Sequence, residues 1–289
     1  MPAALVTLAK AELLPDAPTS DMEAWMAYPS LRWVWDKSAV ATLQGVRCGL
    51  MPMPPPQYPV VLRPLTNMYG MGWQAYVLHS EDDFAAHWGH TGVWTPLLRG
   101  THWSVDAVVE DGRIAWWTAF EGRPARLFGV FDAWHWRHQP AALAAALATF
   151  RQRFLPRLAG FRGCLNLEAI GDTIIEVHLR PGDVGMLAAD DATLLGALRA
   201  PRWPLGPAYR PASRVRCLLP VWWPGPLPWP LAPEAVRSIV SGCAVCTECP
   251  GAVVSGLKRC ALLVAPSAKA AHHDRQQLLR RATAAALAA

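Results

Sequence analysis

Residues 163–182 read Gly163-Cys-Leu-Asn-Leu-Glu-Ala-Ile-Gly-Asp-Thr-Ile-Ile-Glu-Val-His-Leu-Arg-Pro-Gly182, two apolar runs on either side of Gly171-Asp172. That dipeptide is typical of the tight turn between two antiparallel strands. Because side chains alternate between the faces of a strand, Glu176, His178 and Arg180 are expected on one face and their apolar neighbours on the other. The stretch therefore predicts a β-hairpin with one polar face.

The polar side chains of this hairpin suit a metal site. Asn166 and Glu168 share a face of the first strand, so the polar faces of both strands can line one cleft. Two carboxylates with a neutral oxygen or nitrogen ligand form a donor set that suits Mg²⁺ bound to the phosphates of a nucleotide. The alternative is a solvated hairpin face without a ligand, which the same alternation produces.

The composition of the chain limits the classes of protein to consider. With 289 residues, 52% of them apolar, the chain can bury one or two sizeable cores. The formal net charge of +5 is spread over single arginines and not gathered in runs. We therefore expect neither a nucleic-acid partner nor a membrane partner.

The beginning of the chain does not resemble a targeting signal. The apolar run 3–9 contains Thr7, has no basic segment before it and is followed at once by Lys10 and Glu12. No later apolar run reaches the roughly 20 residues needed to span a bilayer. The sequence predicts a cytoplasmic protein.

Four cysteines near the end of the chain raise a separate possibility. Cys243, Cys246 and Cys249 are followed by Cys260, and the first two have the Cys-x2-Cys spacing found in zinc and iron-sulfur sites. In a ferredoxin pattern a fourth cysteine follows soon and directly precedes proline, whereas here Pro250 follows the third. We interpret the group as reduced structural thiols, with a zinc or iron-sulfur protein as an alternative function.

The order of the expected elements predicts an α+β fold in which helices cover one face of antiparallel sheets. Helices are expected to begin at Ser20 and Asp36 and to span 140–155, 233–240 and 268–288. Strands are expected over 58–64, 75–78, 93–98, 103–109, 113–119, 214–222 and 260–265, besides the hairpin.

Five short motifs occur in an order that resembles the ATP-grasp superfamily. They are Asp36-Lys37, the strand at 58–64, Gly70-x-Gly72, the segment 100–106 with Asp111-Gly112, and the hairpin motifs at 166–168 and 175–182. The resemblance implies an ATP-grasp fold of two α+β lobes with ATP between them, its phosphates bridged by Mg²⁺ to the acidic hairpin. It also implies a ligase that phosphorylates a substrate carboxylate and passes the acyl phosphate to an amine or similar nucleophile.

The resemblance implies roles for the polar residues of the hairpin. Glu168 and Glu176 match the metal-binding acids of the family, and His178 stands where the family usually has asparagine, so it is a third metal ligand. Neutral imidazole can ligate a metal, although Mg²⁺ prefers oxygen. Arg180 matches the arginine that steadies the transferring phosphate, and Arg63 takes the place of a phosphate-contacting lysine.

The same resemblance places the nucleotide. Gly70 and Gly72 form the glycine loop over the phosphates, because backbone amides without a Cβ can approach an anion closely. Leu98 matches the position whose backbone meets adenine. His102 replaces an acidic residue that often holds adenine or ribose.

The distribution of lysines departs from the family pattern. No lysine lies between Lys37 and Lys258, so arginine must replace both of the lysines that contact ATP in the family. Arg63 with Arg123 or Arg126 can supply this charge, since guanidinium binds phosphate bidentately. A catalytically inactive ATP-grasp-like binding or structural protein is therefore the alternative to a ligase.

The resemblance also divides the chain. We expect a truncated N-terminal region and linker over 1–56, an ATP-grasp-like body over 57–185 and a small C-terminal α+β appendage over 186–289. The expected partners are small-molecule carboxylate and amine substrates, with a protein partner or a second copy of the chain as a further option to complete the acceptor site. The segment 134–138 is expected in a loop over the site, and the tryptophan-proline run 222–229 is either an exposed patch or a packed loop.

Overall fold

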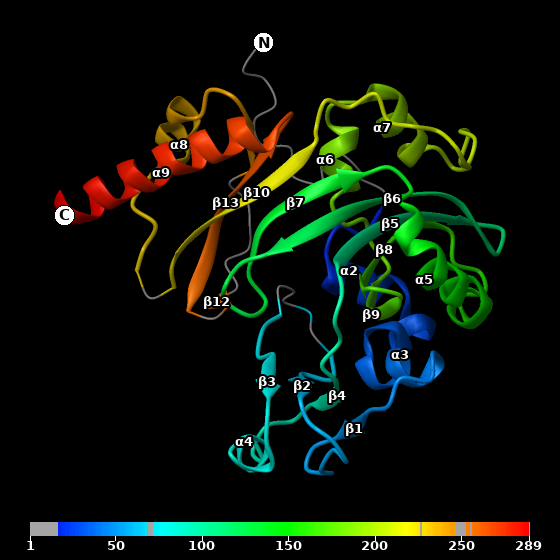
Figure 1. Cartoon of the computed structure of the whole chain (residues 1–289). Helices are drawn as coiled ribbons and strands as arrows, with labels where there is room; N and C mark the ends of the chain where they lie inside the picture. The colour runs from blue at the N-terminus through cyan, green and yellow to red at the C-terminus, as the bar shows by residue number, and fades with distance from the viewer. Residues whose placement is uncertain are drawn as a thin grey trace.

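The computed structural model describes residues 17–66, 68, 72–225, 227–246, 253–254 and 256–288. Its strands form two antiparallel sheets, one of four strands and one of nine. The small sheet lies to one side of the large one, and the hairpin strands β8 and β9 of the large sheet lie toward helix α3 (Figure 1). None of the helices within these residues is long and apolar enough to cross a membrane.

The small sheet has the strand order β1-β4-β2-β3. Its strands are β1 (Gly49–Leu50), β2 (Val60–Arg63), β3 (Tyr76–Leu78) and β4 (Val93–Pro96), with helix α4 (Glu81–Ala85) between β3 and β4. Its own core is small, because among the described residues it consists of the buried side chains Val60, Leu62, Leu78, Phe84 and Trp94. This sheet places Arg63 at the end of β2.

The large sheet carries most of the buried apolar surface. Its order is β11-β13-β10-β7-β6-β5-β8-β9, with β12 paired to β13. The strands are β5 (His102–Glu110), β6 (Arg113–Pro124), β7 (Phe131–Arg137), β8 (Gly163–Ile170), β9 (Thr173–His178), β10 (Cys217–Pro224), β11 (Ala244–Cys246), β12 (Val253–Val254) and β13 (Leu257–Ala265). The C-terminal strands thus continue the sheet that contains the hairpin, while the division of the chain at 56 and 185 stays a prediction.

The faces of the hairpin follow the predicted alternation except at Ile175, because a register shift between Glu168 and Ala169 puts Ile174 in the largest core cluster instead. Leu165, Leu167 and Val177 point into the largest core cluster, where they meet the helical segments at 21–35 and 141–158. Asn166 and Glu168 alternate with them on the other side of β8. The hairpin therefore buries one face and turns its polar face toward the small sheet.

Two short helices bring further polar residues to this face. Helix α2 (Asp21–Ala27) begins with a capping box in which Ser20 and Glu23 bond each other's backbone N–H groups. Helix α3 (Lys37–Leu43) begins where the Asp36 carboxylate accepts from the N–H groups of Ser38 and Ala39. Both caps match the predicted helix starts, and the 3₁₀ segment η1 (Pro29–Trp35) connects the two helices.

Helices also pack on the two sides of the C-terminal half. Helices α6 (Val184–Ala188) and α7 (Ala192–Arg199) follow the hairpin, and α8 (Pro233–Ile239) precedes the long helix α9 (Ala268–Ala288), which lies across β10 and β13 (Figure 1). The strand and helix elements predicted for the C-terminal region are present.

The segment expected as one helix over 140–155 has an irregular course. It comprises a 3₁₀ turn η2 (Ala141–Leu143), α5 (Ala144–Thr149), a π turn η3 (Phe150–Phe154) and a 3₁₀ turn η4 (Leu155–Arg157). Pro156 has no N–H to continue the helical ladder, and the chain passes through it as the single 3₁₀ turn η4. Its predicted apolar stripe is nevertheless buried.

One aromatic segment contradicts the prediction made from the sequence, and a second is only partly packed. The predicted loop over 134–138 is wrong, because most of it is strand β7, paired with β6, and Trp136 is buried in the core. Its alternation of residues is that of a strand, which the family resemblance obscured. In the tryptophan-proline run, Trp223 is buried and packs edge-on against Trp229 with ring centroids 5.4 Å apart. These two tryptophans are packed, while Leu227 between them is 52% exposed.

Candidate active site

The two predicted metal-binding carboxylates lie directly opposite each other. Glu168 on β8 pairs in register with Glu176 on β9, and Asn166 pairs with His178. One donor atom from each of Glu168, Glu176 and His178 lies within 4.8 Å of the others. The hairpin thus gathers the three residues that the sequence predicted as ligands.

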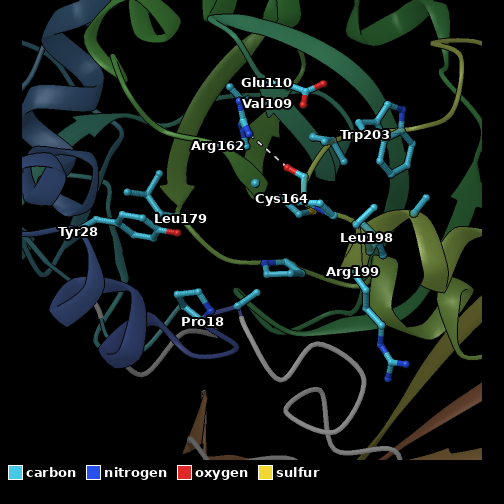
Figure 2. A pocket seen from close by; sticks show the side chains of 17 residues that line it. Pro18, Tyr28, Val109, Glu110, Arg162, Cys164, Leu179, Leu198, Arg199 and Trp203 are labelled. Carbon is cyan, nitrogen blue, oxygen red and sulfur yellow. Dashed lines mark hydrogen bonds between the residues drawn. The ribbon is translucent and has the colours of Figure 1, made fainter.

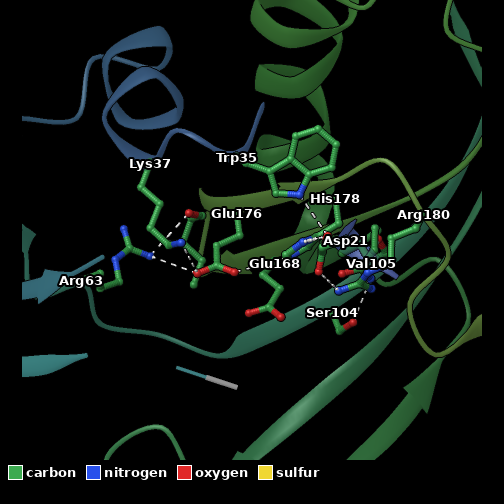
Figure 3. A network of polar contacts seen from close by, with 12 residues as sticks. Asp21, Trp35, Lys37, Arg63, Ser104, Val105, Glu168, Glu176, His178 and Arg180 are labelled. Carbon is green, nitrogen blue, oxygen red and sulfur yellow. Dashed lines mark hydrogen bonds and ion pairs between the residues drawn. The ribbon is translucent and has the colours of Figure 1, made fainter. Parts of the chain in front are cut away.

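The Glu176 carboxylate is surrounded by cations (Figure 3). Its Oε1 lies 3.3 Å from Lys37 Nζ and 3.9 Å from Arg63 Nη1, and its Oε2 lies 3.3 Å from His178 Nε2. Burial alone would raise the pKa of Glu176, but Lys37, His178 and Arg63 outweigh it and hold the pKa well below its usual range. Glu176 is therefore ionised.

Lys37 is a lysine of the site to which the sequence analysis assigned no role. It stands at the first position of α3, is 4% exposed, and directs its ammonium group at the hairpin. A lysine thus does reach the site, although it precedes β2 in the chain. The expectation that arginine replaces the ATP-contacting lysines rested on the stretch between Lys37 and Lys258, because sequence spacing gave no sign that α3 packs against β9.

Asp21 is a second residue that sequence reasoning did not place at the site. This buried residue opens α2, and its Oδ1 accepts hydrogen bonds from Trp35 Nε1 at 3.0 Å and His178 Nδ1 at 2.8 Å. Its Oδ2 accepts from Arg180 Nη2 at 2.7 Å. The sequence showed Asp21 only as part of a helix start.

The charge of His178 follows from these neighbours. Burial and the nearby Arg180 would lower its pKa, but the Asp21 and Glu176 carboxylates outweigh both and raise the pKa to about 9. His178 is then an imidazolium at neutral pH, with one ring nitrogen facing each carboxylate. The two opposed carboxylates suit Mg²⁺, and the roles of Glu168, Glu176 and His178 as its ligands stay predictions.

Arg63 reaches the site from the small sheet. Its Nη1 donates to the carbonyl of Ile175 at 3.4 Å, beside Glu176. Burial lowers the pKa of Arg63, while Glu176 and Glu168 act in the opposite direction. An arginine normally titrates far above neutral pH, so Arg63 keeps its charge and joins the two sheets.

His102 contacts a carboxylate of the hairpin. At the start of β5, its Nε2 lies 3.1 Å from Glu168 Oε2. Its ring packs edge-on against Phe131 and Trp134, with centroids 4.8 and 5.5 Å away. The predicted contact of His102 with the nucleotide stays a prediction.

The other nucleotide-binding candidates lie in loops. Gly72 adopts a φ of +64°, and a Cβ there would lie 3.8 Å from Cα of Gly129, so the loop adjoins the β6–β7 connection that carries Arg126. Arg126 is exposed, and Leu98 is half-buried just after β4. Gly70 lies outside the described residues. The roles of these four residues stay predictions.

A buried aspartate fixes the backbone that follows Arg180. Asp106 of β5 accepts hydrogen bonds from the backbone N–H groups of Gly182 and Val184, the latter at 2.8 Å. A Cβ on Gly182 would lie 2.7 Å from Cγ of Asn166 and 2.9 Å from Oδ1 of Asp106. The residue after Pro181 must therefore be glycine for the chain to pass this close.

A cavity elsewhere on the large sheet is separate from these groups. It has a volume of about 250 Å³ and lies at the opposite end of β5 and β8, where Glu110, Cys164 and Trp203 help to line it (Figure 2). None of the predicted site residues lines it.

The cysteine group is described only in part. Burial, with Asp274 nearby, raises the pKa of the Cys243 thiol, and Cys260 Sγ contacts the carbonyl of Lys258 at 3.6 Å. Cys249 and the side chain of Cys246 lie outside the described residues. The zinc or iron-sulfur alternative stays a prediction.

Comparison with known proteins gives similarity in structure and not in sequence. The sequence matches no protein-family model, and no curated protein matches it. Among solved structures, carboxyaminoimidazole ribonucleotide synthase from Aspergillus clavatus, complexed with ATP, has a TM-score of 0.62 and 13% identity, covering 89% of this chain and 75% of its own.

Two further structures show the same similarity. L-amino acid ligase from Bacillus licheniformis has a TM-score of 0.58 and 11% identity, covering 86% of this chain and 71% of its own. N5-carboxyaminoimidazole ribonucleotide synthetase from Thermus thermophilus has a TM-score of 0.55 and 17% identity, covering 90% and 78%. With its two antiparallel sheets and its similarity to these structures, the chain has a divergent ATP-grasp fold.

Proposed function

We propose that this protein is an ATP-dependent ligase that activates a carboxylate as an acyl phosphate for attack by an amine or similar nucleophile. The observation that carries the proposal is the pair of opposed carboxylates, Glu168 and Glu176, with Lys37, Arg63 and Arg180 around them. Acids that hold a divalent cation beside cations that neutralise phosphate are what phosphoryl transfer requires.

The reaction has two steps. A carboxylate oxygen of the substrate attacks the γ-phosphorus of ATP, the bond to the β,γ-bridging oxygen breaks, and ADP leaves with that electron pair. The amine nitrogen then attacks the acyl carbon, the bond from that carbon to the phosphate oxygen breaks, and phosphate leaves. The amine loses one proton, so the products are ADP, phosphate and an amide.

The residues of the chain divide this work. Glu168 and Glu176 would hold Mg²⁺, which when bound neutralises charge on the phosphates. Lys37 and Arg63, which pair with Glu176 in this structure, would also contact the phosphate oxygens and neutralise part of their negative charge. Arg180 would neutralise the transferring phosphoryl group, because its guanidinium is held beside the carboxylates and keeps its charge.

The activities of the similar structures support this proposal. Those structures include an L-amino acid ligase and a carboxyaminoimidazole ribonucleotide synthase complexed with ATP. A second candidate, a member that binds nucleotide without turnover, is favoured by one observation: the chain's own cations already neutralise both oxygens of Glu176.

Two measurements test the proposal. MgATP is expected to raise the melting temperature, whereas no effect of MgATP, MgADP or MgGTP would rule out both candidates. ADP release is then measured with a panel of amino acids and other small carboxylates, with hydroxylamine as the nucleophile. Formation of hydroxamate that depends on one carboxylate supports the ligase, while binding without any turnover across a broad panel favours the inactive member.

A further inference from the structure

We propose that Asp21 is a positioning residue that orients Arg180 for the transferring phosphoryl group, an inference that rests on the proposed function. Asp21 is 5% exposed and opens α2, far from the hairpin in sequence. Nothing in the motifs that resemble the ATP-grasp superfamily includes it. Its position at the site comes from the structure alone.

Both oxygens of the Asp21 carboxylate accept hydrogen bonds from neighbouring side chains. Oδ2 accepts from Arg180 Nη2 at 2.7 Å, while Oδ1 accepts from His178 Nδ1 at 2.8 Å and Trp35 Nε1 at 3.0 Å. A charged hydrogen bond to arginine is strong and directional. The indole holds the carboxylate from one side and the imidazolium from another, so the carboxylate fixes where the guanidinium lies.

The rest of Arg180 is held as well. Its Nη1 donates to the carbonyl of Pro181 at 3.2 Å, and the chain beyond it is tied to Asp106 through Gly182 and Val184. The Arg180 side chain is 17% exposed, so it is not closed off from solvent. A charge fixed before the phosphoryl group arrives need not reorganise during transfer.

The same carboxylate links Arg180 to the metal-binding acids. Through His178 the contacts run from Asp21 to Glu176 and on to Lys37 (Figure 3). One buried aspartate thus fixes both the arginine and the imidazolium beside the carboxylates. An asparagine in its place would turn an NH₂ group toward one of the cationic donors, which repels it.

The test compares MgADP with MgADP plus aluminium fluoride, an analogue of the transferring phosphoryl group, by isothermal titration calorimetry. The wild-type protein is expected to bind the combination at least about tenfold more tightly than MgADP, because analogues of the transition state bind best. Asp21→Asn is expected to keep the MgADP affinity within about threefold and to lose this preference. Asp172→Asn, at the exposed hairpin turn, is the control and is expected to keep it.

The outcomes separate the two proposals. If the wild-type protein binds no nucleotide, the proposed function fails. If it prefers the analogue and Asp21→Asn keeps that preference, or if it binds MgADP without any preference, the positioning role is overturned. In an Arg180→Ala background, Asp21→Asn is expected to change the preference no further, whereas an added loss would show a structural role only.

A second variant covers the case in which Asp21→Asn does not fold. Asp21→Glu keeps the negative charge that the two cations require but moves the carboxylate by one methylene group. It is expected to lose the preference as well, since position and not charge is at stake. Retention of the full preference by Asp21→Glu would overturn the proposal.

Discussion

Substitutions of the two hairpin carboxylates are expected to differ in how much stability they cost. Glu176 is the less useful target, because its loss leaves Lys37 and Arg63 buried without their partner, which costs about 3–5 kcal/mol when a buried pair is broken. Glu168 is 33% exposed and, within the part of the chain that the structure describes, forms an ion pair only with His102. A change at Glu168 therefore separates metal binding from stability.

Glu168→Gln is expected to abolish the Mg²⁺-dependent part of the nucleotide effect on melting temperature. The amide still reaches His102 but no longer offers a charged ligand, so stability without ligand should fall by less than about 1 kcal/mol. Glu121→Gln is the matched control, since Glu121 is 35% exposed and pairs with Arg137 on β7. An unchanged Mg²⁺-dependent shift in Glu168→Gln would exclude this carboxylate from the metal site.

The charge of His178 predicts a pH dependence of stability. Its pKa is about 9 in the folded protein and about 6.5 in the unfolded chain, so the folded state holds the proton more tightly. This contribution is complete below about pH 6.5 and is lost as the pH rises through 9, on the order of 3 kcal/mol in total. Urea unfolding at pH 6, 7.5 and 9 measures it.

His178→Asn is the comparison for this dependence. The variant cannot titrate there, so the difference in free energy of unfolding between the two proteins should shrink as the pH rises from 6 to 9. A constant difference over this range would mean that folding leaves the pKa of His178 unshifted. Other titrating groups cancel in the difference, because both proteins share them.

At the scale of elements, the ends of helices and strands decide where the charges of the site lie. Asp21 and Lys37 are the first residues of the capped helices α2 and α3, and Glu168 and Glu176 lie opposite each other on the hairpin. The turn from β9 into α6 is held by Asp106, which places the backbone after Arg180. The geometry of this turn should therefore be sensitive to a single added methyl group.

Gly182→Ala is expected to lower the free energy of unfolding by about 1–3 kcal/mol, because the new Cβ would collide with Asn166 and Asp106. Gly196→Ala on α7 is the opposite case, since nothing lies within 4 Å of its added Cβ. Alanine at that helical position should stabilise by about 0.5–1 kcal/mol. Equal effects of the two substitutions in urea unfolding would contradict the close approach at Gly182.

At the scale of the whole molecule, the two sheets differ in the size of their cores. The small sheet buries a few side chains of its own, whereas the large sheet is packed on both faces. Local opening costs least where few apolar contacts are lost. Arg63, from the small sheet, meets Glu176 in the large one, so a ligand at this contact should couple them.

Hydrogen exchange is expected to show this difference. Amides of β2, β3 and β4 should exchange faster than those of β5, β6 and β8, and MgATP should slow the exchange of the small sheet most. MgADP without the γ-phosphate serves as the comparison ligand. Equal protection of the two sheets without nucleotide would contradict the difference in packing.

The sequence by itself determined the hairpin, the helix starts and the ATP-grasp order of motifs. The hairpin and the helix starts follow from signals local in the chain: alternation at 163–182, the turn at Gly171-Asp172, and the caps at Ser20 and Asp36, whereas the motif order rests on a family resemblance. Local interactions of this kind link residues a few positions apart, so their physical cause is readable from spacing.

Only the tertiary structure decided which charges face the carboxylates. Lys37 meets Glu176, and Asp21 meets His178 and Arg180, across sequence separations of 157 and 159 residues for the two Asp21 contacts. The Asp21 and Glu176 carboxylates then raise the pKa of His178 against the effect of burial. Such contacts depend on how α2 and α3 pack against β9, and packing leaves no fixed spacing in the sequence.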